Sequence, residues 1–139
     1  MRRIPIALVV PAAAVLVTVA ATAQQEAPSA PATVKGVMVT MTVPASDVIF
    51  DAASEPPKDH QQWVAVRTSA LMLAESGKLL MTGERVKDGT TWMEMARALV
   101  DQAEATLKAA EARNGDALSK AGDDVYLTCE TCHARYMDK

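Results

Sequence analysis

The sequence has few of the residues that build most metal and catalytic sites. It contains only two cysteines and two histidines in 139 residues. A structural zinc site uses four cysteine or histidine ligands, and besides the three at 129–133 this chain offers only His60, far upstream. No serine–histidine–aspartate arrangement, pair of catalytic carboxylates or phosphate-binding loop stands out. These absences argue against a zinc protein, and we predict that the chain is not an enzyme.

The sequence also lacks a strand pattern and a basic cluster. No stretch alternates apolar and polar residues as a half-buried strand does. The formal net charge is −3, and lysine and arginine are not concentrated in any segment. Such a chain is poorly suited to nucleic acid or to an anionic membrane surface. We therefore expect an all-α protein that does not bind nucleic acid and whose partner is a basic or locally basic protein.

The N-terminus has the features of a secretory signal. Two arginines precede an apolar run over 4–20, and residues 21–23 (Ala-Thr-Ala) have the small-x-small form of a cleavage site. The run is short and contains two prolines, so it predicts no membrane insertion after cleavage. We predict a signal peptide over 1–23, a flexible mature N-terminus over 24–32, and a periplasmic protein. Cleavage leaves 12 basic and 17 acidic residues, a net charge of −5.

Four later segments carry apolar residues at helical spacing. They cover about 33–53, 59 to a stop at Gly83, 91 to a stop at Asn114-Gly115, and about 116–137. Helices of these lengths joined by short loops pack antiparallel around one core. The pattern predicts one domain over 33–139, folded as an antiparallel up-down-up-down four-helix bundle.

Local signals support these segments. Asp59 with Gln62, and Thr91 with Glu94, have the spacing of a capping box. Pro44 has no N–H and is expected to kink the first segment. Several small residues should let the helices approach closely and leave space for a large flat ligand: Ala70, Ala74, Gly77, Ala96 and Ala103.

The most specific signal is Cys129-Glu130-Thr131-Cys132-His133, which has the Cys-x-x-Cys-His form of a c-type haem attachment site. On a helix, Cys129, Cys132, His133 and Tyr136 share one face. Both thiols can then form thioethers to the haem, and the imidazole can bind the iron. A dithiol redox pair or half of a zinc site are the alternatives. The first would follow a strand, and the second needs more ligands. The motif thus predicts one covalent haem c.

With this motif near the C-terminus of an exported four-helix chain, the sequence resembles the class II c-type cytochromes, which include the cytochromes c′ and c556. Only the haem motif is a specific match. In that family it usually continues His-x-x-Tyr-Arg. Here Tyr136 is kept, Met137 follows it, and Arg135 lies on its other side. The resemblance implies a periplasmic monohaem protein with a redox partner protein. It also leaves open a homodimer, because related bundles often pair through their first two helices.

The sixth iron position decides between two functions. In the family, the residue facing the histidine comes from the first helix, where this chain has Met38 and Met41. Helical geometry cannot separate residues at i and i+3. The Gly-Val-Met sequence at 36–38 resembles the placement in the c556-like members, so we favour Met38. That predicts electron transfer through a low-spin His/Met haem. The alternative is a five-coordinate, c′-like protein that binds NO or CO, in which both methionines only pack.

The remaining candidates have simpler readings. Met137 lies four residues after His133 and so on the same side of the haem, which excludes it as the opposite ligand. His60 is expected at a helix start, and Trp63 and Trp92 are expected in the core.

Overall fold

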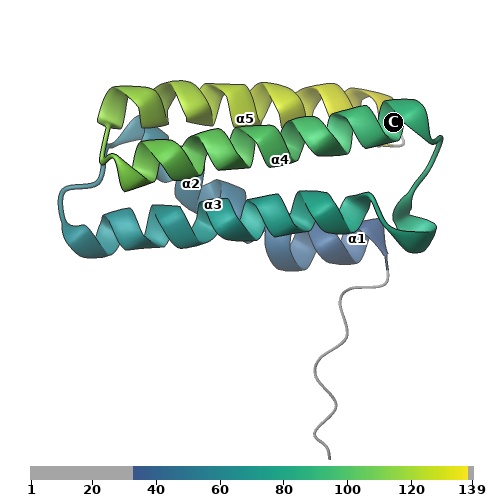
Figure 1. Ribbon diagram of the computed structural model, residues 1–139, viewed down its shortest axis with the longest axis horizontal. Coiled ribbons are helices and arrows are strands. Elements are labelled where there is room, and N and C mark those ends of the chain that lie inside the picture. The colour runs from purple at the N-terminus through teal and green to yellow at the C-terminus, as the bar shows by residue number, and fades with distance from the viewer. Residues whose placement is uncertain (1–32, 138–139) are drawn as a thin grey trace, which may run out of the picture.

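A computed structural model describes residues 33–137, and every regular element in that range is helical (Figure 1). The predicted signal peptide, 1–23, and the predicted flexible stretch, 24–32, lie outside the described residues. The elements in chain order are α1 (Val34–Val37), the π-helix η1 (Met38–Thr42), α2 (Val43–Ser54), α3 (His60–Leu80), the 3₁₀ turn η2 (Gly83–Arg85), α4 (Thr90–Glu111) and α5 (Gly115–Tyr136).

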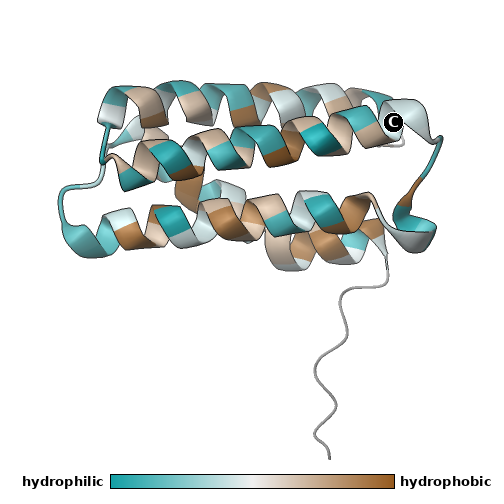
Figure 2. Ribbon diagram, viewed as in Figure 1, coloured by the Kyte–Doolittle hydropathy of each residue, from teal (hydrophilic) through white to brown (hydrophobic). Residues whose placement is uncertain are grey.

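The helices form four long segments, because α1, η1 and α2 follow one another without a break. α3 packs against α4, α4 packs against α5, and α2 packs against both α3 and α5. Figure 2 shows hydrophobic and hydrophilic residues interleaved along the helices, as expected when each helix buries one face. The predicted all-α helical bundle is confirmed at this level.

The first segment accommodates Pro44 with a π-helical stretch, whereas we predicted a simple kink at the proline. Five residues before it, Met38–Thr42, form a π-helix, and the Val43 N–H donates to the Met38 carbonyl. α2 continues the same helix from Val43, and Pro44 is its second residue. The missing N–H of Pro44 is therefore accommodated next to a π-helical stretch, without a break in the helix.

One of the two predicted helix caps is present, and the last helix has a cap that was not predicted from the sequence. Asp59 caps α3 by accepting from the Gln62 N–H at 2.8 Å, and Asn114 caps α5 by accepting from the Ala117 N–H at 3.0 Å. The predicted Thr91 cap of α4 is wrong. α4 begins one residue earlier, and the Asp88 carboxylate accepts from the Trp92 N–H at 3.0 Å.

Two clusters of buried apolar residues form the core. The larger one gathers side chains from all four segments, including Ile49, Leu73, Trp92 and Val125. The smaller one lies where α2 and α4 end and α3 and α5 begin: Ala52, Trp63, Val66, Ala109, Ala110 and Leu118. The tryptophans are therefore core residues, as predicted.

Small residues bring the helices close together. A Cβ atom on Gly77 would lie 2.7 Å from a Val100 methyl on α4, and one on Gly122 would lie 2.4 Å from the Ala53 Cβ on α2. Both distances are shorter than any normal contact, so larger residues would force these helices apart. The expected close approach at Gly77 is confirmed.

The first segment, Val34–Ser54, is long and apolar enough to cross a membrane by length and composition alone. A core helix of a globular bundle passes the same test. Val37, Ala45 and Ile49 are fully or almost fully buried against the other helices, whereas Val39 and Val43 are exposed.

Candidate functional site

The Cys-x-x-Cys-His motif lies on the last turns of α5, and its side chains line a cavity of about 240 Å³. Cys129, Cys132 and His133 form the α5 wall. The first segment, the end of α3 and the start of α4 form the other walls, and most of the lining is apolar. The remaining lining residues are Met38, Thr42, Val43, Ser46, Phe50, Leu80, Trp92, Met95, Ala96, Leu99, Tyr126 and Thr128. The cysteines are half-buried and the histidine is exposed.

A second cavity, of about 620 Å³, adjoins the first. The two share five lining residues: Met38, Val43, Trp92, Cys132 and His133. The second also reaches Val34, Tyr136 and Met137, so it extends past the ends of α1 and α5. Ligand pockets commonly have volumes of about 300–1,000 Å³, and these cavities together offer space in that range.

The two candidate methionines differ in position. Both are half-buried. Met38 lines both cavities and packs against the larger core cluster, whereas Met41 is absent from the lining of either. From the sequence, Met38 is favoured only by resemblance, because the geometry of an α-helical turn cannot separate residues three apart. The turn is in fact π-helical, so residues three apart no longer share a face as closely.

The thiols are in a poorly solvated setting. Burial raises the pKa of Cys129, and the neighbouring Cys132 raises it further. Burial also raises the pKa of Cys132. Both groups are therefore held as neutral thiols at neutral pH, because a thiolate would lose hydration there.

Tyr136 is fixed by a group that the sequence did not reveal. Its hydroxyl donates to the Asp88 carboxylate at 2.7 Å, and its ring meets Trp92 edge to face with centroids 5.0 Å apart. Since Asp88 also caps the start of α4 through Trp92, one carboxylate ties that start to the end of α5. The only sequence signal was an acidic residue directly before a helix start.

Arg135 forms an ion pair with the same Asp88 carboxylate. Its guanidinium lies 3.4 Å from the Asp88 oxygen and 5.6 Å from the centre of the Tyr136 ring. It does not line either cavity. The hydrogen bond from Tyr136, together with the bonds from the Trp92 N–H and from Arg135, holds the pKa of the Asp88 carboxyl below its usual value.

A buried polar pair holds the first segment to α3. The Thr42 hydroxyl donates to the Ser76 hydroxyl at 3.0 Å, and Ser76 donates to the Leu73 carbonyl at 2.7 Å. Both side chains are almost fully buried. The pair lies where the first cavity begins, because Thr42 is also part of its lining.

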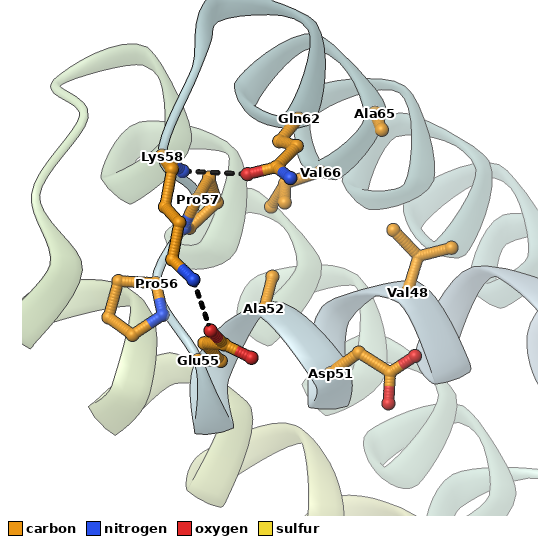
Figure 3. A pocket seen from close by; sticks show the side chains of 10 residues that line it. All are labelled: Val48, Asp51, Ala52, Glu55, Pro56, Pro57, Lys58, Gln62, Ala65 and Val66. Atoms are coloured by element: carbon orange, nitrogen blue, oxygen red, sulfur yellow. Dashed lines mark hydrogen bonds and ion pairs between the residues drawn. The ribbon is translucent and has the colours of Figure 1, made fainter.

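Two other cavities lie away from the motif. One, of about 350 Å³, opens beside the α2–α3 connection, where Lys58 pairs with Glu55 and its N–H donates to Gln62 (Figure 3). The other, of about 160 Å³, is lined by His60 and Arg113, whose side chains lie 2.8 Å apart. His60 is the first residue of α3 and is exposed, as predicted.

Comparison with known proteins gave no matching family model, no similar curated protein and no similar solved structure.

Proposed function

We propose that this chain is a periplasmic, single-haem c-type cytochrome that transfers electrons. Haem c is attached through Cys129 and Cys132, with His133 and Met38 as the two axial ligands. The observation that carries the proposal is the cavity lining. Two thiols and an imidazole in the spacing of a haem attachment site line the same apolar cavity as a thioether from another helix.

Two thiols, an imidazole and a thioether are the groups that a covalently attached haem with two axial ligands needs. When bound, a haem with imidazole and thioether ligands supplies one-electron chemistry at a raised potential. The chain's contribution is to hold and bury it. α5 offers both thiols and the imidazole on one side, and the first segment offers Met38 from another side of the cavity. The apolar lining excludes water from the space between them.

The proposal includes an antiparallel, up-down-up-down order of the four segments. Short connections support that order, since only residues 55–59, 81–89 and 112–114 link successive long helices. It also includes cleavage of residues 1–23, a redox partner protein, and no enzymatic activity of the chain.

The first test is an absorption spectrum of the mature protein, ferric and ferrous, with and without carbon monoxide. We expect a low-spin spectrum with an iron–thioether charge-transfer band that carbon monoxide does not change. A high-spin iron that binds carbon monoxide would instead establish the five-coordinate, gas-binding alternative. A colourless protein would contradict both haem functions and would favour a dithiol or metal-binding protein instead.

Substitutions assign the ligands. Met38→Ala should turn the iron high-spin and open it to carbon monoxide. Met41→Ala is the matched control, because it removes the same side chain one turn away and should leave the spectrum unchanged. His133→Ala should impair haem binding. If Met41→Ala changes the spin state and Met38→Ala does not, the ligand assignment is wrong.

A further inference from the structure

The second cavity combines an apolar lining with two cations. Lys35, from α1, and Lys87, from the connection before α4, both line it. No carboxylate lines it, and its other titratable groups are Cys132, His133 and Tyr136, all from α5. An apolar space flanked by two ammonium groups matches a ligand with an apolar body and two carboxylates.

These two lysines differ from most others in the bundle. Lys58, Lys78 and Lys120 each pair with a carboxylate one helical turn away or nearby in sequence. Within the part of the chain that the structure describes, neither Lys35 nor Lys87 has a hydrogen bond or ion pair from its ammonium group. Their charge is therefore free to act on a ligand.

Arg135, next to the motif, already has an ion-pair partner. Arg135 pairs with Asp88 and lies outside the cavity lining. The Asp88 carboxylate accepts from Tyr136, which does line the cavity, and from the Trp92 N–H at the start of α4. The lysines are then the cations left to meet an anion in this cavity.

We propose that Lys35 and Lys87 bind the two propionate carboxylates of the haem and keep them ionised. This inference rests on the proposed function, since it assigns contacts to the same group. It would also place two cations beside the two further negative charges that haem brings to a mature chain with a net charge of −5.

The test is the midpoint potential of the haem-loaded protein, measured by redox titration from about pH 5 to about pH 8. In the wild type the propionates are ionised throughout, so the potential should be nearly constant. In the double variant Lys35→Gln/Lys87→Gln, the propionate pKa rises into this range because the cations are lost. The potential should then fall as the pH rises, since deprotonation stabilises the oxidised iron.

Two matched variants complete the design. Lys35→Arg/Lys87→Arg keeps both charges and should restore the constant potential. Lys108→Gln removes one exposed lysine near the far end of α4 and should behave as the wild type. All three variants should have the wild-type far-ultraviolet circular dichroism, because the substituted residues are exposed.

The outcomes separate this inference from the function. If the double variant binds haem and its potential is as constant as that of the wild type, the lysine assignment is overturned and the cytochrome function stands. It is also overturned if Lys108→Gln produces the same slope, because long-range charge would then be the cause. A wild-type protein that binds no haem overturns both proposals.

Discussion

The closed end of the bundle, around the smaller core cluster, and the open end, around the first cavity, differ in the apolar space between their helices. At one end, Trp63, Leu118 and four small residues close into the smaller core cluster, and Gly122 brings α5 against Ala53. At the other end, Trp92 and Leu80 form the walls of an apolar cavity instead of filling it. Each end has one buried tryptophan, so aromatic content alone does not explain the difference.

The difference between the two ends comes from the residues at which neighbouring helices contact one another. At the closed end, Gly122 lets α5 approach α2 at Ala53, and the two cavities there, beside the α2–α3 connection and beside His60, are lined partly by charged side chains. At the open end, the π-helical turn between α1 and α2 and the carboxylate link of Asp88 fix the helix positions without filling the space between them. The difference indicates that the open end has unfilled apolar space, so truncating a side chain there should cost less stability than truncating one in the smaller core cluster.

The largest effect should come from truncating the closed end. Leu118 is fully buried, so Leu118→Ala should lower the free energy of unfolding by about 2–5 kcal/mol. Leu99→Ala removes the same atoms beside the first cavity. It should cost less in the haem-free chain, because that side chain already faces empty space.

Urea unfolding followed by circular dichroism measures both variants. Loading the protein with haem should raise the cost of Leu99→Ala toward that of Leu118→Ala, because the ligand then contacts Leu99. Equal costs in the haem-free chain would mean that the two ends are packed alike.

A smaller effect is expected from adding one methyl group at the closed end. A Cβ on Gly122 would lie 2.4 Å from that of Ala53, so Gly122→Ala should push α5 from α2. Overpacking typically costs about 1–3 kcal/mol, partly offset by the better helix propensity of alanine, worth about 1 kcal/mol. We expect a net loss of stability in thermal unfolding.

The compensating substitution makes this prediction specific. Ala53→Gly removes the atom that Gly122→Ala would meet, so the double variant should be more stable than the sum of the two single changes predicts. Additive effects would mean that the helices do not meet at these residues.

The sequence predicted the helices well because their determinants are local. Apolar spacing and the predicted cap at Asp59 depend on residues a few positions apart. The failures involved long-range partners. Thr91 has the expected cap spacing, but Asp88 takes that role while also accepting from Tyr136, 48 residues later. No local pattern encodes such a pairing.

At the candidate site, too, local features could be predicted from the sequence and long-range contacts could not. The position of Cys129, Cys132 and His133 on one helix face follows from their spacing alone. The placement of Met38 beside them depends on how the first segment crosses the bundle and on a π-helical turn. Lys35 and Lys87 are 52 positions apart in a chain with 14 basic residues, and only the fold brings them to one cavity.

The smallest effect concerns the link at the open end. The pKa of Asp88 is held below its usual value of 3.8, so its carboxylate adds stability above that pH, and the contribution is lost as the pH falls through the lowered pKa. Asp88→Asn removes the charge at every pH. The variant should therefore melt slightly below the wild type at neutral pH, and the difference should shrink as the solution is acidified.

Melting temperatures measured from about pH 7 down to about pH 3 test this. Asp101→Asn, an exposed aspartate on the same helix, is the control and should follow the wild type at each pH. If the gap between Asp88→Asn and the wild type is the same at both ends of the range, the charge contributes nothing. The start of α4 and the end of α5 would then be held together by neutral hydrogen bonds and by the Trp92–Tyr136 ring contact alone.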